Sequence, residues 1–268
     1  MRYTVLVDNR SNDPALPTEH GLSVLLEASC HRILLDTGAS DLVVHNAQRL
    51  GIDLHTVDYV FLSHGHADHA GGLSSFLQVN DHARIIVSAQ ALSGQFYSKR
   101  GELHSITPHW PIEEMRDRLL VIETTQVVDD DILVIANIGR QHPVPLGNRN
   151  LYLRVGDDYV PDAFRHELAL CCEGFLFSGC AHSGVENILD ACAWPVHTVL
   201  GGLHLLDAHL GVTYETPAQL RALAERLQSH YPDTQFLTSH CTGDAAYATL
   251  HDVMGEQLHP FGVGVQGQ

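Results

Sequence analysis

The 268-residue sequence has no long run of apolar residues. A membrane-spanning helix needs about 18 or more of them in succession, and no segment approaches that length. The first apolar run stops before Asp8 and is too short for a signal peptide. We therefore expect a cytoplasmic protein with no membrane partner.

Positive charge is also scarce. The chain has 15 Lys and Arg against 32 Asp and Glu, a formal net charge of −17. Such a surface repels phosphate backbones, so we expect no nucleic-acid partner and disfavour a nuclease. Eight of the 15 basic residues nevertheless lie between Lys99 and Arg165. A small-molecule substrate, including an anionic one, is therefore the expected partner, and the oligomeric state stays open.

Cysteine pairs with regular spacing are absent. The six cysteines stand at positions 30, 171, 172, 180, 192 and 241, with no CxxC motif. Cys171 and Cys172 are adjacent, an awkward geometry for a bridge between them. Reduced thiols, as in a cytoplasmic protein, are the expectation. The sequence also has no Gly-rich phosphate-binding loop and no Ser, His and Asp in the order of a catalytic triad.

What the chain does contain is an alternation of short β-branched runs with helical patterns, which predicts an α/β fold. A helix is expected over 40–51 with Ser40 as its N-cap, and another over 216–231 that starts with the capping box Thr216–Gln219. Residues 99–118 look irregular, as in a lid or an insertion. The expected strands include 3–7, 22–28, 32–36, 59–62, 84–88, 119–123, 132–137, 151–155, 175–179 and 234–239.

Histidine is concentrated in the stretch SHGHADHAGG, residues 63–72. His64 and His66 are two residues apart in chain that leaves a strand, so both imidazoles can reach one ion. Small neighbours let the backbone turn close to the site, which makes Asp68 and His69 available to a second ion. Imidazole with carboxylate suits Zn²⁺ best, with Fe and Mn as alternatives.

Four ligands cannot complete two metal sites, so other segments must contribute. Cys180 and His182 follow one predicted strand, and His240 and Cys241 follow another. His204, in GGLHL, is more suited to contact the substrate than to bind metal. Asp36, at the end of the strand LLDTG, is expected to orient ligands rather than to be one.

These motifs resemble the metallo-β-lactamase superfamily, through His64-x-His66-x-Asp68-His69 and LLDTG. The segments EHGLSVLLE, DTGAS, NAQRLGID, GCAHSGVENIL, GGLHL and HCTG look in particular like the branch of 7,8-dihydropterin-6-yl-methyl-4-(β-D-ribofuranosyl)aminobenzene 5′-phosphate synthase-like proteins. The resemblance extends over residues 3 to 255. It implies a single domain over residues 1–268, an αββα sandwich in which two mixed sheets lie face to face with helices outside.

The resemblance also implies two metal sites. His64, His66 and His182 would hold one ion, and Asp68, His69 and His240 the other. His166 lies where many relatives have their third histidine, and it is the alternative to His182 as the third ligand of the first ion. Where most of the superfamily has a bridging Asp, this sequence has Cys180, either as a thiolate ligand or as an uncoordinated thiol.

The function expected from this resemblance is a metal-dependent hydrolase with a dinuclear site, zinc above iron or manganese, that activates water against a small substrate. Phosphorylated compounds are one candidate class. Asp68 would hold the attacking water, and His204 or His20 would donate to charge that develops on the substrate. The first alternative is a transferase of the synthase type that uses the same metals. An alternative of another class is a di-iron redox or sensor protein, which would require a flavin-binding partner domain.

Overall fold

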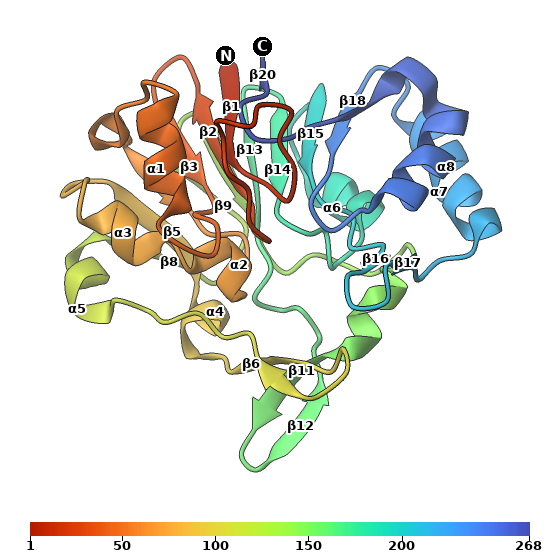
Figure 1. Cartoon of the computed structure of the whole chain (residues 1–268), viewed down its shortest axis with the longest axis horizontal. Helices are drawn as coiled ribbons and strands as arrows, with labels where there is room; N and C mark the ends of the chain where they lie inside the picture. The colour runs from red at the N-terminus through yellow and green to blue at the C-terminus, as the bar shows by residue number, and fades with distance from the viewer.

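Two seven-stranded sheets lie face to face at the centre of the computed structural model, which describes residues 1–268 (Figure 1). The first sheet has the order β20 (Gln266–Gly267), β1 (Arg2–Val7), β2 (Ser23–Glu27), β3 (Arg32–Leu35), β4 (Tyr59–Phe61), β5 (Arg84–Ser88), β8 (Leu119–Ile122). The second has the order β19 (Leu258–Pro260), β18 (Gln235–Thr238), β15 (Thr198–Gly201), β14 (Phe175–Ser178), β13 (Ala169–Cys172), β10 (Ile132–Ile135), β9 (Gln126–Asp129).

Helices cover the outer face of each sheet, so the predicted αββα sandwich is confirmed (Figure 1). The first sheet is covered by α1 (Leu42–Arg49), α3 (Leu73–Leu77), α4 (Ala89–Ser93) and α5 (Ile112–Met115). The second is covered by α6 (Val185–Ala191), α7 (Pro217–His230) and α8 (Asp244–Met254). None of the helices is both long and apolar enough to cross a membrane.

Both sheets are mixed. Strands β3, β4, β5 and β8 run parallel, as do β14, β15, β18 and β19, whereas β1–β2–β3 and β9–β10–β13–β14 pair antiparallel. Strands buried on both faces need apolar residues at every position. In β3, for example, Ile33 and Leu35 face the other sheet while Leu34 faces the helices.

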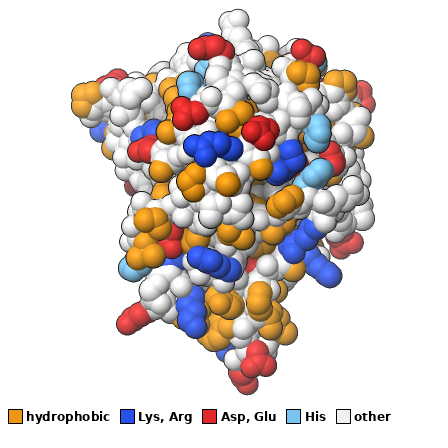
Figure 2. Space-filling model, turned by 90° about the vertical axis from the view of Figure 1, so that its right-hand side faces the viewer, with side chains coloured by type: hydrophobic (Ala, Val, Ile, Leu, Met, Phe, Trp, Pro, Cys, Tyr) orange, Lys and Arg blue, Asp and Glu red, His pale blue; other side chains and the backbone are white.

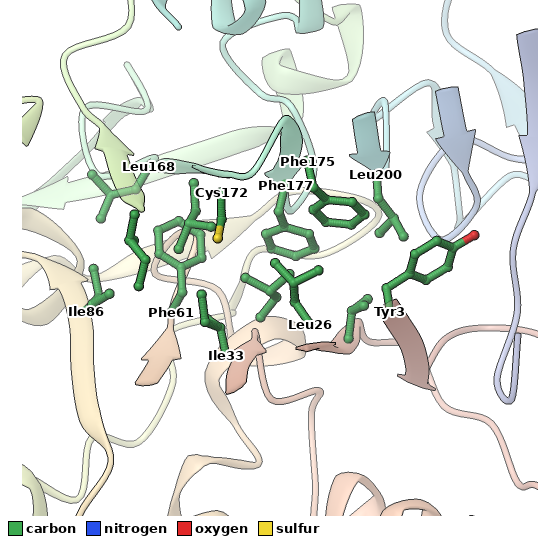
Figure 3. Packing of buried hydrophobic residues seen from close by; sticks show 14 of the residues in the cluster. Tyr3, Leu26, Ile33, Phe61, Ile86, Leu168, Cys172, Phe175, Phe177 and Leu200 are labelled. Carbon is green, nitrogen blue, oxygen red and sulfur yellow. The ribbon is translucent and has the colours of Figure 1, made fainter. Parts of the chain in front are cut away.

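The two sheets pack through a core of large side chains (Figure 3). Phe61 of the first sheet and Phe177 of the second meet edge to face, with ring centroids 6.1 Å apart and planes at 86°. Such aromatic pairs add to the free energy gained from burial alone. The contact holds the ends of β4 and β14 together, and the predicted site residues follow these two strands.

A smaller four-stranded sheet lies below the sandwich in Figure 1. It consists of β12 (Asp158–Pro161), β11 (Leu151–Val155), β6 (Phe96–Ser98) and β7 (His104–Ser105). The segment 99–118, expected to be a lid or an insertion, supplies β7, α5 and the 3₁₀ turn Arg116–Arg118. The remaining elements are α2 (Ala67–Ala70), the hairpin β16 (Leu206–Asp207) and β17 (Val212–Thr213), and 3₁₀ turns at Leu54–Thr56, Leu146–Asn150 and Gly255–Gln257.

Local capping follows the sequence at one helix and departs from it at another. Thr216 and Gln219 form the predicted capping box of α7. At α1, however, the N-cap is Asp41 and not Ser40. Ser40 Oγ still accepts the Leu42 backbone N–H at 3.2 Å, as a cap would, and its hydroxyl donates to the Glu19 carboxylate at 2.5 Å, a charge-assisted hydrogen bond to a distant loop.

Replacement of Phe177 by Ala should lower the free energy of unfolding by about 3–5 kcal/mol, because it leaves a cavity between the two sheets. Denaturant unfolding of both proteins in excess chelator measures this change without a contribution from metal. Val127→Ala is the control, since Val127 is 53% exposed, and should change stability by about 0.5 kcal/mol or less. Equal effects of the two substitutions would contradict the described core.

Candidate metal centre

The predicted site residues converge where parallel strands of both sheets end. Asp36 follows β3, His64 to His69 follow β4, Cys180 to His182 follow β14, His204 follows β15, and His240 and Cys241 follow β18. Carboxyl ends of parallel strands share one edge of a sheet, which is where α/β proteins commonly build ligand sites. Because the two sheets are stacked, the two edges lie against each other.

Three histidines form the first group of donor atoms. One ring nitrogen from each of His64, His66 and His182 lies within 4.8 Å of the others. Each Nε2 is buried and has no hydrogen-bond partner. Burial lowers the pKa of His66 to about 3 and the pKa values of His64 and His182 well below their ordinary range. The imidazoles are therefore neutral, as metal ligands must be.

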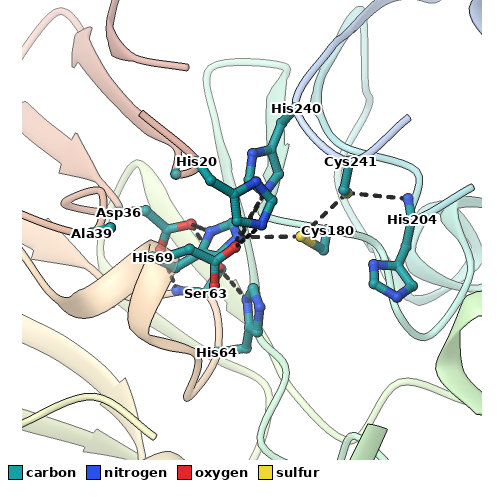
Figure 4. Close-up of polar contacts among 12 residues, drawn as sticks. His20, Asp36, Ala39, Ser63, His64, His69, Cys180, His204, His240 and Cys241 are labelled. Atoms are coloured by element: carbon teal, nitrogen blue, oxygen red, sulfur yellow. Dashed lines mark hydrogen bonds and ion pairs between the residues drawn. The ribbon is translucent and has the colours of Figure 1, made fainter. Parts of the chain in front are cut away.

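A hydrogen-bond relay around Asp36 orients two of the histidines (Figure 4). His64 Nδ1 donates to Ser63 Oγ at 2.8 Å, and Ser63 Oγ donates to Asp36 Oδ2 at 2.7 Å. His69 Nδ1 donates to the same carboxylate oxygen at 2.6 Å. With Nδ1 occupied, each ring presents Nε2 to the site. Asp36 thus has the expected orienting position.

The ring of His182 is oriented from a different part of the chain. His182 Nδ1 donates to Asn148 Oδ1 at 3.0 Å, and Asn148 Nδ2 donates back to the His182 carbonyl oxygen at 2.8 Å. Below this turn, the buried Glu167 carboxylate accepts the backbone N–H groups of His182 and Ser183 at 2.7 and 2.6 Å. Both the backbone and the ring of His182 are held.

His166 lies nearby but has no free nitrogen. Its Nδ1 accepts from the Gly65 backbone N–H at 3.0 Å, and its Nε2 donates to Asp162 Oδ2 at 3.0 Å. Of the two rivals, it is His182 that presents an unpartnered nitrogen beside His64 and His66.

A second group of donors surrounds Asp68. Asp68 Oδ2 lies 3.6 Å from His69 Nε2 and 3.5 Å from His240 Nε2, and these two nitrogens are 3.2 Å apart. Donors bound to one tetrahedral zinc lie about 3.3 Å from each other, given bonds of about 2.0–2.1 Å. The three atoms therefore have the spacing of a shared ligand set.

The second group is charged where the first is neutral. Burial opposes ionisation of Asp68, but His69 and a hydrogen bond from His240 hold its pKa well below the ordinary value. Burial alone would lower the pKa of His240, yet the charges of Cys241 and Asp68 raise it to about 9. In the metal-free protein a proton on His240 therefore balances the Asp68 carboxylate.

The Asn9 side chain contacts the rings of His240 and His20 on the outer side of this second group. His240 Nδ1 donates to Asn9 Oδ1 at 3.0 Å, while Asn9 Nδ2 lies 3.3 Å from His20 Nδ1. His20 stacks on His240 with centroids 5.1 Å apart and places Nε2 3.4 Å from Asp68 Oδ2. His20 thus stands beside Asp68 at the edge of the centre.

Two cysteines complete the centre. Cys180 Sγ lies 3.2 Å from His69 Nε2 and 3.3 Å from Cys241 Sγ. Burial raises the pKa of the Cys180 thiol well above its ordinary value. Burial acts in the same direction on Cys241, but a proton shared with Cys180 and the positive His240 lower the pKa of the Cys241 thiol well below it.

His204 borders the centre and is held from outside by Arg100. Arg100 Nη2 donates to His204 Nε2 at 2.9 Å, so His204 carries its proton on Nδ1. That nitrogen is buried and has no partner. Arg100 Nε also donates to the Tyr214 hydroxyl at 3.1 Å, and Arg100 takes part in none of the ion pairs of the structure.

A cavity of about 490 Å³ opens onto these residues. Its walls include both cysteines, Asp68 and His240 of the second donor group, and Arg100. The full lining is His20, Ala39, His66, Ala67, Asp68, Ser98, Arg100, His104, Ser105, Ile106, Leu151, Cys180, His182, His204, Leu206, Ala208, His209, His240 and Cys241. The volume suits a small-molecule substrate.

Four non-glycine residues at this edge have left-handed backbone conformations. The φ angles are 55° at Asp36, 50° at Ala181, 52° at His204 and 52° at His240. Each stands just beyond a strand, where the sharp turn aims the side chain or its neighbour at the centre.

All residues predicted as ligands or catalytic groups therefore lie at this centre: His20, His64, His66, Asp68, His69, Cys180, His182, His204 and His240. Sequence reasoning missed the groups that orient them, namely Asn9, Ser63, Asn148, Glu167 and Arg100. Only Ser63, adjacent to His64 and at a strand end, could have been found from its position in the sequence.

Comparison with known proteins agrees with this geometry. Residues 16–136 match the family described as the metallo-beta-lactamase superfamily. An uncharacterised protein of Methanocaldococcus jannaschii is 28% identical over 98% of this chain and 97% of its own length. The 7,8-dihydropterin-6-methyl-4-(beta-D-ribofuranosyl)-aminobenzene-5′-phosphate synthase of the same organism is 25% identical over 90% of this chain and 87% of its own.

A solved structure points the same way. A protein described as a metal-dependent hydrolase of the beta-lactamase superfamily superposes with a TM-score of 0.80 at 26% identity, over 100% of this chain and 98% of that one. The matched residues, the relatives and the shared fold together identify a domain of the metallo-beta-lactamase superfamily in this chain.

Proposed function

We propose that this protein is a hydrolase with a dinuclear metal centre, zinc being the preferred ion, that acts on a small phosphorylated substrate. The observation that carries the proposal is the convergence of three buried, unpartnered Nε2 atoms, from His64, His66 and His182, beside a cavity that His66 and His182 line. Leaving a buried polar atom without a partner costs about 1–3 kcal/mol. Three such atoms aimed at one point are best explained by a cation that they share.

The residues of the second group fit a second ion. Asp68, His69 and His240 have mutual donor distances of 3.2–3.6 Å. A dication in place of the proton on His240 would keep Asp68 charge-balanced. When bound, the two ions would supply Lewis acidity and make water nucleophilic at neutral pH.

The protein groups around the cavity provide the remaining functions. Asp68 would orient the attacking water and accept its proton, with His20 Nε2 3.4 Å away as the next acceptor. His204 would donate its Nδ1 proton to charge on the phosphoryl group or on the leaving oxygen. Attack of water on phosphorus breaks the ester P–O bond and releases an alcohol and phosphate.

Arg100 supports a phosphorylated substrate. Its guanidinium lines the cavity, and neither of its hydrogen-bond partners, His204 and Tyr214, is a carboxylate. Arginine is well suited to bind phosphate oxygens. Figure 2 shows other basic side chains among apolar ones over the middle and lower parts of one face, in a chain whose net charge is −17.

A transferase that uses the same metals is the second candidate. It is favoured by the relative named as a phosphate synthase, which matches 90% of this chain at 25% identity. Product analysis separates the two: a hydrolase incorporates oxygen from labelled water into its product, whereas a transferase moves the group to a second substrate.

His64→Ala and His182→Ala should each remove about one metal ion per chain and abolish turnover, because each deletes a ligand of the first group. Elemental analysis and hydrolysis of phosphate esters measure the two effects. His166→Ala is the control and should keep both ions, since both of its ring nitrogens are occupied. Metal loss in His166→Ala but not in His182→Ala would show that the ligand was assigned wrongly.

Asn148→Ala and Asn9→Ala should weaken different ions. Each removes the amide that orients one ligand ring, His182 or His240, and loss of such partners typically costs 10–100-fold in metal affinity. Competition with a chelator of known affinity resolves the two binding steps. If both variants weakened the same step, the division into two ligand groups would be wrong.

Arg100→Ala should lower kcat/KM for phosphomonoesters by about 10- to 100-fold, the equivalent of the roughly 1.5–3 kcal/mol of a charged hydrogen bond. Turnover of a neutral ester should fall less, because it loses only the support that Arg100 gives to His204. Arg116→Ala removes the same charge from an exposed ion pair and should leave both rates unchanged. An equal loss on neutral and phosphorylated substrates would count against phosphate recognition by Arg100.

A further inference from the structure

The chain has two cysteines at the centre, and a dinuclear hydrolase site requires neither of them. We propose that Cys180 and Cys241 act as a pair of thiolate ligands which join the second donor group, Asp68, His69 and His240, and coordinate its metal ion on the side of His240. This inference rests on the proposed function, because it assigns ligands within that metal centre.

The donor atoms are already grouped. Cys180, His240 and Cys241 each place one donor within 4.8 Å of the other two, and all three residues are buried at the cavity wall. The sulfur atoms lie 3.3 Å apart (Figure 4). Two sulfurs on one tetrahedral zinc lie about 3.8 Å apart, given bonds of about 2.3 Å. A movement of about half an ångström would therefore suffice.

The surrounding backbone is shaped around the sulfur of Cys241. A Cβ atom at Gly202 would lie 2.4 Å from Cys241 Sγ, so a side chain at that position would displace the sulfur. The backbone N–H of His204 donates to Cys241 Sγ at 3.2 Å. A hydrogen bond of this kind stabilises negative charge on the acceptor. Residues after β15 thus both make room for the sulfur and favour its thiolate form.

Cys180 lies between the two donor groups. Its sulfur also groups with His64 and His69 on one side and with His182 and His204 on the other. Cys241 belongs with Cys180 and His240. Cys180 can therefore contact either ion, whereas Cys241 distinguishes the second ion from the first.

Coordination has a defined stoichiometry and selectivity. Binding of one dication by two thiols forms two metal–sulfur bonds and releases two protons to solvent, without oxidation or reduction. Thiolates are soft ligands and favour Zn²⁺ and Co²⁺ over Mn²⁺ or Mg²⁺. A site with two sulfurs should therefore retain zinc in the presence of excess manganese.

Cobalt substitution tests the pair, because thiolate ligands give Co²⁺ a sulfur-to-metal charge-transfer band in the near ultraviolet. Metal-free protein is titrated with Co²⁺ under anaerobic conditions, and bound cobalt is measured in parallel. We expect the band to develop with the second equivalent, to fall to about half in Cys241→Ser, and to be absent when Cys180 is also replaced. Cys192→Ser, at the end of α6, is the matched control and should leave the band unchanged.

Alkylation of the wild-type protein provides a measurement that needs no variant. Bound metal should protect Cys180 and Cys241 from iodoacetamide, whereas the exposed Cys30 should react with or without metal. Mass spectrometry of peptides reports each position.

The outcomes separate this inference from the proposed function. Cobalt bound by wild-type protein with no charge-transfer band and no protection overturns the thiolate pair and leaves the metal centre intact. A band that is unchanged in Cys241→Ser overturns the role of Cys241. Failure of wild-type protein to bind cobalt or zinc overturns the proposed function and this inference together.

Discussion

One buried carboxylate, that of Asp36, connects the two donor groups of the candidate metal centre to the first sheet. It accepts the backbone N–H and the hydroxyl of Ser63 and the Nδ1 proton of His69, each within 2.7 Å. Through Ser63 it also determines which nitrogen of His64 is free. Leaving a buried polar group without a hydrogen-bond partner costs about 1–3 kcal/mol, and more when the group is charged. The orientation of a ligand in each donor group therefore depends on this single side chain.

The spacing of His64, His66, Asp68 and His69 was enough to predict a metal centre, because ligand spacing in a turn is a local property. Strand ends that carry polar residues led to His182, His204 and His240 for the same reason. The αββα arrangement followed from the resemblance and is confirmed by the fold. Ser40 shows where local reasoning is incomplete: its oxygen accepts the Leu42 backbone N–H at the start of α1, as expected of a cap, but its hydroxyl also donates to a carboxylate 21 residues away.

The sequence could not show which imidazole nitrogens already have a hydrogen-bond partner within the protein. His166 and His182 are equally good ligands by residue type. They differ because Gly65, 101 residues from His166, donates to its ring, and because Asn148, 34 residues from His182, leaves one nitrogen of that ring free. Likewise, Arg100 meets His204 across 104 residues. Contacts at such separations depend on how the small sheet and the 3₁₀ turn at Leu146–Asn150 pack against the sandwich, and no periodicity in the sequence encodes that packing.

The left-handed residues at the strand ends have a consequence for how this protein tolerates change. A non-glycine residue in this region costs of order 1 kcal/mol or more and persists only where the surroundings enforce it. Asp36, His204 and His240 bear functional side chains and cannot exchange them for glycine, but Ala181 has no such role. The edge that holds the centre is therefore strained even without metal, and the rest of the sandwich must be stable enough to sustain it. A loss of core stability is therefore expected to disorder this edge before the two sheets separate.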